Sequence, residues 1–197
     1  KTTYDMYGFP EELYKIVYDS LGSPDYAHLT QSLIDRKVTV DNSWGYDHGN
    51  WSVLHHMFPD RNIPVFQLSI DGTATPTVHY EIGKQLNDLR EKGVLILGSG
   101  NVVHNLRMVN WSMENSGYDW VETFDKYVIE NIKKKTYDNI IHYELAGESA
   151  SLAVPTPDHF YPLLYVLGAL DENDTASIYN ESYVLGSLSM TCFLFDS

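Results

Sequence analysis

The stretch between residues 63 and 98 constrains the fold more than any other part of the chain. Residues 63–70 (IPVFQLSI) are rich in branched and aromatic side chains, as β-strands are. Residues 77–93 place apolar side chains at helical spacing and end on a glycine, and residues 94–98 (VLILG) are a short apolar run. A strand, a helix and a strand of these lengths predict a βαβ unit with parallel strands covered on both faces.

We therefore expect an α/β fold, in which residues 1–197 form a single domain with a mostly parallel central sheet flanked by helices. Further helices are predicted at 10–24, 24–37, 50–59, 120–135 and 156–170, and further strands at 38–41 and 187–195. Pro162 predicts an early break in the last of these helices, because proline has no backbone N–H to donate. The apolar composition of residues 187–195 indicates a mostly buried strand.

The charge and cysteine content exclude several classes of protein. A formal net charge of −14 makes the chain a poor partner for nucleic acid or for an anionic membrane surface. Its one cysteine, Cys192, excludes an intrachain disulfide and a cysteine-based zinc site, and it suits a reducing compartment, so we predict a cytoplasmic location. No apolar run is long enough to span a membrane, and the opening residues do not resemble a signal peptide.

His104 is the first of three histidines whose positions suggest function. It follows the predicted strand at 94–98 after a short loop containing Gly98 and Gly100, which allow a tight turn and a close approach to a ligand. In open α/β sheets, ligands bind beyond the carboxyl ends of the strands, which is where this loop is expected. The alternative is a histidine that only makes a hydrogen bond within the loop.

His48 and His159 also lie where functional side chains are common. His48 stands between two glycines in GYDHGNW, in a loop just before a predicted helix. The alternative there is that Asp47 caps a turn and His48 is exposed. His159 lies in PTPDHFYP, where three prolines provide the rigid placement that a metal ligand requires, although a surface histidine at a helix start is also common.

The other five histidines lack a pattern that favours function. His55 and His56 are adjacent, whereas two ligands on one helix are expected four residues apart, so they are interpreted as structural or exposed. His28, His79 and His142 are predicted to be surface residues. The sequence also lacks a phosphate-binding loop and the G-x-S-x-G motif of serine hydrolases.

Six segments, taken in order, resemble one known family. They are YDMYGFPEELYKIVY, WGYDHGNWSVLHHMFP, IPVFQLSID, GVLILGSGNVVHNL, PTPDHFYPLLYVLGA and the closing GSLSM. Together they resemble the 4,5-DOPA extradiol dioxygenases, a branch of the class III extradiol ring-cleavage enzymes. The resemblance runs from the first residues to the last, and the ordered set is far more specific than any one segment.

The resemblance implies a mononuclear metal, iron(II) for ring cleavage or zinc(II) as in some relatives, and a catechol such as DOPA with O₂ as substrates. His159 corresponds to a metal ligand, and His104 to an acid–base histidine that ligates the metal in some members. His48 corresponds to a histidine that lines the substrate pocket. Family members also carry two earlier histidine-bearing motifs, HGSP-like and AHW-like, which are missing from this sequence, so we expect it to hold only part of the metal site.

The residues leave other interpretations open. The competing function is a zinc-binding hydrolase or a metal-binding relative without catalytic activity. Arg107 is a candidate for binding a substrate carboxylate or for a structural ion pair, and Trp44, Tyr46 and Trp51 for walling an aromatic pocket or for core packing. The sequence predicts neither the particular catechol nor the oligomeric state.

Overall fold

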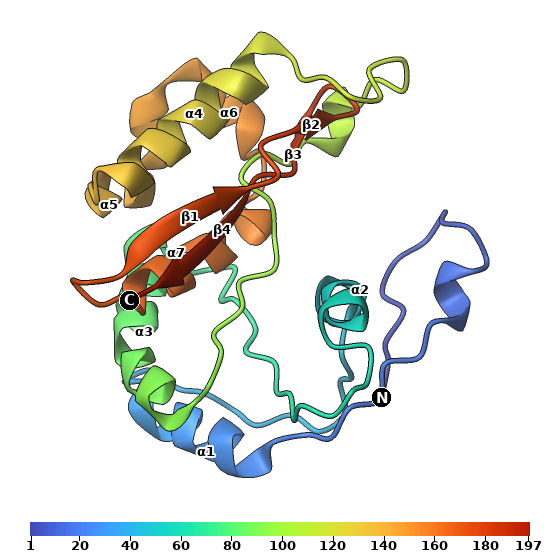
Figure 1. Ribbon diagram of the computed structural model, residues 1–197, viewed down its shortest axis with the longest axis vertical. Helices are drawn as coiled ribbons and strands as arrows, with labels where there is room; N and C mark the ends of the chain where they lie inside the picture. The colour runs from blue at the N-terminus through green and yellow to red at the C-terminus, as the bar shows by residue number, and fades with distance from the viewer. The chain divides into compact units, whose positions relative to one another are not determined.

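The computed structural model describes residues 1–197, which divide into two compact units, Lys1–Ser69 and Ile70–Ser197 (Figure 1). The first unit contains the 3₁₀ helix η1 (Leu13–Lys15) and the helices α1 (Pro24–Leu33) and α2 (His48–Met57). Of the helices predicted here, the two at α1 and α2 are confirmed. The helix predicted at 10–24 is wrong, because only the single turn η1 forms.

A small aromatic core holds the first unit together. Tyr18, Trp51 and Leu54 are buried, and partly buried apolar side chains surround them. The indole Nε1 of Trp51 donates to the carbonyl oxygen of Thr3 at 3.0 Å, which ties α2 to the first residues of the chain. Trp51 is therefore a core residue, whereas Trp44 is exposed.

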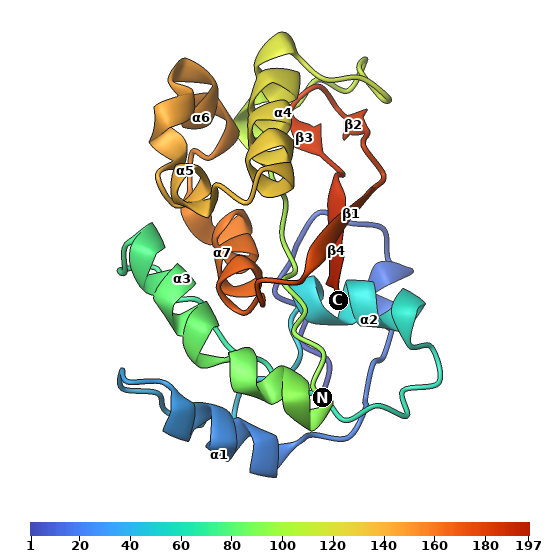
Figure 2. The same ribbon diagram turned by 60° about the vertical axis from the view of Figure 1, so that its left-hand side comes forward.

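The second unit is mostly helical, with two short antiparallel strand pairs near its C-terminal end (Figure 2). Its α-helices are α3 (Pro76–Gln85), α4 (Asp119–Lys133), α5 (Tyr137–Ile141), α6 (Glu148–Ala153) and α7 (Tyr161–Gly168). The 3₁₀ helices are η2 (Asn87–Lys92), η3 (Leu106–Met108), η4 (Tyr143–Ala146) and η5 (Pro157–His159). The strands are β1 (Thr175–Tyr179), β2 (Tyr183–Val184), β3 (Leu188–Ser189) and β4 (Cys192–Asp196).

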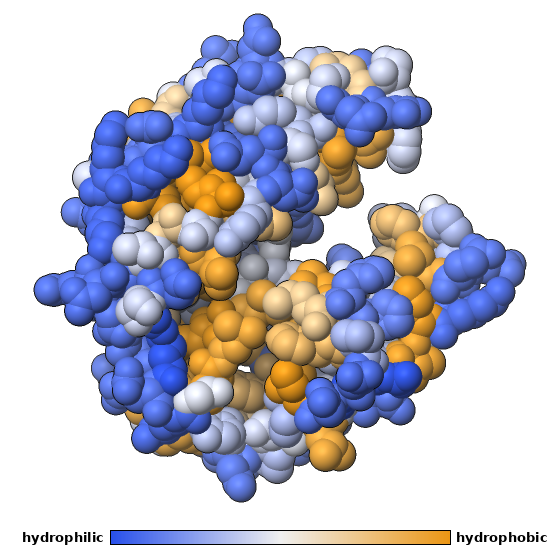
Figure 3. All heavy atoms as spheres, viewed as in Figure 1, coloured by the Kyte–Doolittle hydropathy of each residue, from blue (hydrophilic) through white to orange (hydrophobic).

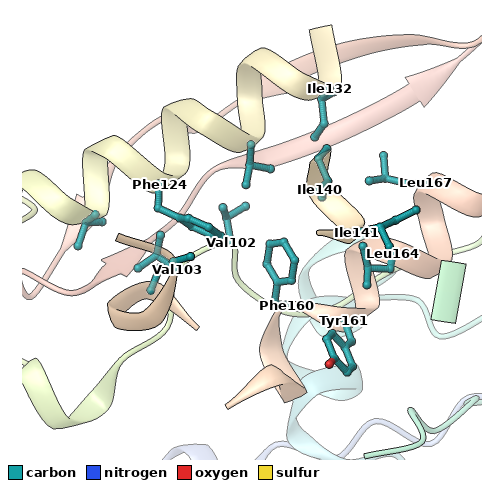
Figure 4. Close-up of a cluster of buried hydrophobic side chains, with 14 residues drawn as sticks. Val102, Val103, Phe124, Ile132, Ile140, Ile141, Phe160, Tyr161, Leu164 and Leu167 are labelled. Atoms are coloured by element: carbon teal, nitrogen blue, oxygen red, sulfur yellow. The ribbon is translucent and has the colours of Figure 1, made fainter. Parts of the chain in front are cut away.

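Helix α4 shows why the core forms where it does. Its apolar residues recur at helical spacing and are buried, whereas Glu122 and Lys126 form an exposed ion pair on its other side. Hydrophilic side chains accordingly cover the outer face of α4 in Figure 3. The buried face belongs to a cluster that also includes Val102, Val103, Phe160 and Leu164 (Figure 4).

Helices α3 and α7 approach each other closely because glycines face each other at their contact. A Cβ atom on Gly83 would overlap the carbonyl oxygen of Tyr165, and one on Gly168 would overlap that of Tyr80. The predicted break at Pro162 is confirmed, since the helix is divided into η5 and α7. These features place His159 in the short turn that leads into α7.

The predicted mostly parallel central sheet is not observed. The strands form two antiparallel pairs instead: β1 with β4, from Thr175↔Asp196 to Tyr179↔Cys192, and β2 with β3. Residues 63–70, 94–98 and 38–41 belong to no strand. Leu95 is 60% exposed, so the prediction that 94–98 is covered on both faces is also wrong.

The physical reason is that an apolar extended segment becomes a strand only when another backbone pairs with it. The N–H of Val65 donates to Leu21, and the N–H of Val94 donates back to Leu89 at the end of η2, so neither segment enters a ladder with a second strand. The helix predicted at 77–93 forms as α3 followed by η2, with Gly93 in the left-handed region at φ +75°.

Residues 187–195 were predicted to be a mostly buried strand, and they form strands that are only partly buried. Residues 187–195 contain β3 and most of β4, but alternate residues of β4 are exposed, because only the face that carries Phe193 and Phe195 packs against the core. None of the helices has the length and apolar character needed to cross a membrane.

Candidate functional site

His104 and His159, which are distant in the sequence, lie face to face in the second unit. Their ring centroids are 3.5 Å apart and their planes differ by 8°. Each is next to a core residue: Val103, with 0% of its surface exposed, precedes His104, and Phe160, with 1%, follows His159. Both anchors belong to the cluster drawn in Figure 4, so the burial of two neighbours brings the two imidazoles together.

The backbone holds His104 from two directions. Its N–H donates to the carbonyl oxygen of Ala153 at the end of α6, at 3.0 Å, and it forms an isolated antiparallel bridge with Leu188. The following residue, Asn105, is buried, and its side-chain Nδ2 donates to the carbonyl oxygen of Leu152 at 2.8 Å. The half-buried His104 therefore has little freedom to move with its loop.

His159 is held by the glycine-containing loop that precedes His104. The N–H of Asn101 donates to the carbonyl oxygen of His159 at 2.9 Å. A Cβ atom on Gly100 would overlap that same oxygen, so only glycine permits this approach. Gly98 lies against the same turn less tightly, since a Cβ atom there would come within 2.8 Å of the carbonyl oxygen of Pro162, so both glycines noted in the sequence serve the packing beside His159.

A carboxylate orients the ring of His159. Nδ1 lies 2.7 Å from Oδ2 of Asp158, and a carboxylate only accepts, so this contact favours the tautomer in which Nδ1 donates and Nε2 is the acceptor nitrogen. Burial acts to raise the pKa of Asp158, but a hydrogen bond from Thr156 and the nearby His159 lower it, and the net pKa is below its ordinary value. A carboxylate behind an imidazole is the usual arrangement around a metal-binding histidine.

The described residues fit only part of a metal site. In neither unit do three or more His, Cys, Asp or Glu side chains gather around a point that could hold a metal ion. The lone pairs of His104 and His159 lie in their ring planes, and parallel planes stacked at 3.5 Å do not meet at one cation. As the rings stand, one of them at most ligates a given metal.

His48 lies in the first unit, at the first position of α2. Its backbone N–H and its Nδ1 lie 2.9 Å and 3.0 Å from Oδ1 of Asp5, while Asp47 caps the helix by accepting from the N–H of Asn50. Burial acts to raise the pKa of Asp5, but the hydrogen bonds from His48 outweigh it and the pKa is lowered. The side chain of His48 is 47% exposed, and its role in a substrate pocket stays a prediction.

The remaining histidines correct one expectation. His79, predicted at the surface, is fully buried: its Nδ1 is 3.0 Å from the hydroxyl of Tyr165, and its ring centroid is 4.4 Å from that of Tyr161. The spacing of the aliphatic residues in this helix does not reveal that the imidazole of His79 also faces the core. His28 and His142 are exposed, as predicted.

Sequence reasoning missed the residues that fix the histidines in place. Asp5 is far from His48 along the chain, so no spacing indicated their contact. Asp158 was visible inside PTPDHFYP, and a carboxylate next to a candidate ligand was the signal that could have identified it.

A comparison with family models decides the relationship. Residues 1–193 match the model of LigB, described as the catalytic LigB subunit of aromatic ring-opening dioxygenase. The chain belongs to this family. The resemblance predicted from the six segments is thereby confirmed.

Individual LigB-family relatives agree with this result. A 4,5-DOPA dioxygenase extradiol of Escherichia coli (strain K12) is 43% identical over 194 residues, which are 96% of this chain and 71% of the relative. The enzyme of the same name from Beta vulgaris is 35% identical over 200 residues, covering 100% of this chain and 74% of the relative.

The fold is shared as well. A crystal structure of the uncharacterized protein JW3007 from Escherichia coli K12 superposes with a TM-score of 0.83 at 40% identity, over 92% of this chain and 76% of that one. The LigB-like fold of the chain is therefore established, and the names of its relatives support a ring-cleaving dioxygenase.

Proposed function

We propose that this protein is a metal-dependent extradiol dioxygenase, which opens the ring of a catechol such as DOPA with O₂ beside its hydroxyl groups. The observation that carries the proposal is the stacked pair of His104 and His159, formed by two of the six family segments and held together by the core. The curated relatives from Escherichia coli and Beta vulgaris, both named for this reaction on DOPA, support the choice of substrate class.

Within the pair we assign metal binding to His159 and proton transfer to His104. The contact with Asp158 favours the tautomer in which Nε2 of His159 is the acceptor nitrogen, as a ligand requires, and holds the ring in one orientation. We assign to the ring of His104 the acceptance of a catechol proton and its later return, in accordance with its family motif, because an imidazole in general titrates near neutral pH. Ligation by both rings at once would require one of them to turn.

Further metal ligands would have to come from outside the pair. Neither unit by itself brings three candidate ligands together. We propose iron(II) as the metal, since it exchanges electrons with O₂ and zinc(II) does not. His48 is proposed to hydrogen-bond the substrate through its ring, in accordance with its family motif.

The test uses the full-length protein loaded with iron(II) without oxygen, then given DOPA and air. We expect the yellow, ring-opened semialdehyde to appear, and we expect zinc-loaded protein to produce none. His159→Ala should lose metal, whereas His104→Ala should keep much of the metal and lose turnover. His142→Ala, which changes an exposed histidine of the same unit, is the matched control and should behave as the wild type. Absence of product from protein with a full complement of iron would reject the proposal.

A further inference from the structure

The second unit contains a buried carboxylate that the proposed chemistry does not use. Asp125 lies on the inner face of α4, next to the core residue Phe124, and 0% of its surface is exposed. Burying a carboxylate is unfavourable unless several hydrogen bonds replace its water. Its position in the middle of a core therefore calls for a reason beyond the packing of the helix.

All three hydrogen-bond partners of Asp125 come from one segment near the C-terminus. The hydroxyl of Ser189 donates to Oδ1 at 2.6 Å, and the hydroxyls of Thr191 and Tyr183 donate to Oδ2 at 2.9 Å and 3.3 Å. Three donors on one carboxylate fix the segment 183–191 against α4 more firmly than a two-residue hairpin could be fixed by its own ladder.

The same segment pairs with the backbone on both sides of His104. The N–H of Ser189 donates to Val103 at 3.1 Å, and the N–H of Asn105 donates to Ser187 at 3.2 Å. The side-chain Nδ2 of Asn101 adds a bond of 2.9 Å to the carbonyl oxygen of Ser189. His104 is thus the central residue of a short antiparallel contact, opposite Leu188.

Ser189 connects the two halves of this arrangement, because its hydroxyl binds Asp125 while its N–H binds the residue before His104. We propose that Asp125 is a positioning residue, which holds the ring of His104 opposite His159 through the segment 183–191. The inference rests on the proposed function insofar as His104 transfers protons. A shift of the ring by about 1 Å is enough to reduce the rate of a proton transfer severely.

The experiment compares Ser189→Ala with Tyr127→Phe in the full-length, metal-loaded protein. Tyr127 is also on α4, and its hydroxyl donates to Asn139 at 2.9 Å, so its loss removes one hydrogen bond of the same helix without touching the segment 183–191. We expect Ser189→Ala to lower kcat about tenfold with KM unchanged. Tyr127→Phe should keep kcat at a similar loss of thermal stability.

Asp125 itself is tested by two substitutions of similar size. Asp125→Asn keeps an acceptor oxygen for Ser189 and should retain more kcat than Asp125→Leu, which keeps none. If Asp125→Leu does not fold, the comparison of Ser189→Ala with Tyr127→Phe still decides the matter. Equal losses of kcat in those two variants, or no loss in either, would overturn the positioning role.

A second readout separates this inference from the proposed function. The imidazole signals of His104 and His159, assigned by nuclear magnetic resonance from the His→Ala variants, should shift in Ser189→Ala and not in Tyr127→Phe. If wild-type protein shows no ring cleavage but these shifts occur, the proposed function fails and the positioning role stands. If His104→Ala abolishes turnover but Ser189→Ala moves neither kcat nor the signals, the positioning role fails alone.

Discussion

Gly100→Ala is the sharpest perturbation of the histidine pair, because a single methyl group meets the backbone of His159. The added Cβ would overlap the carbonyl oxygen of His159, and that oxygen would have to retreat by about 1 Å to reach an ordinary carbon–oxygen distance of about 3.3 Å. The obstacle is backbone and not the end of a flexible side chain, so the turn that carries His159 has to move as a whole.

Two costs follow from this movement. The hydrogen bond from Asn101 to the carbonyl of His159, 2.9 Å long, is stretched or lost, at about 1 kcal/mol. Forcing an extra methyl group into packed backbone costs a further 1–3 kcal/mol, so we expect a loss of about 2–4 kcal/mol in the free energy of unfolding. The stacking of the two imidazoles should be disturbed in the same step.

The assay is urea unfolding together with ring-cleavage activity. Gly72→Ala is the matched control, because a Cβ at Gly72 meets nothing within 4 Å and its φ is not positive. We expect the control to unfold like the wild type and to retain activity, and Gly100→Ala to lose both stability and activity. A Gly100→Ala protein with wild-type stability and turnover would refute the claim that this close approach sets the geometry of the pair.

Three further predictions concern charged groups of the second unit. Arg90→Ala should cost about 3–5 kcal/mol of stability, because it leaves Asp174, whose side chain is 1% exposed, buried without its ion-pair partner. The hydrogen bond from Arg90 lowers the pKa of Asp174, so the wild-type protein should lose this stability as the pH falls below 3.8. Urea unfolding at several pH values should show this loss in the wild type and not in the variant. Burial raises the pKa of Asp125 despite its hydroxyl partners, so ionisation of this carboxyl should cost stability as the pH rises above 3.8. Asp125→Asn should therefore become more stable relative to the wild type from pH 4 to 7 in urea titrations. Stability profiles of the two proteins that run parallel over this pH range would contradict the prediction. Asp158→Asn should weaken metal binding by about 10–100-fold, measured by competition with a chelator, and unchanged affinity would count against His159 as a ligand.

The short-range features of the chain were accessible from the sequence. The helices at α1, α2 and α4 follow from apolar spacing, and the break at Pro162 and the end of η2 at Gly93 follow from the conformations of proline and glycine. These signals depend on residues a few positions apart, so they were read without knowing the rest of the fold. The sheet was mispredicted because residues 63–70 and 94–98 have the composition of strands, and composition does not supply the second backbone that a strand requires.

The candidate site divides in the same way. Composition, motifs and family resemblance singled out His48, His104 and His159 as residue types suited to metal and proton chemistry. The tertiary structure decided three further features. His104 and His159 stack at 3.5 Å, and Gly100 leaves room for the carbonyl group of His159. Asp125 is connected to the loop of His104 through Ser189. The physical reason is that these contacts join segments far apart along the chain, and only the burial of Val103 and Phe160 in one core places them together.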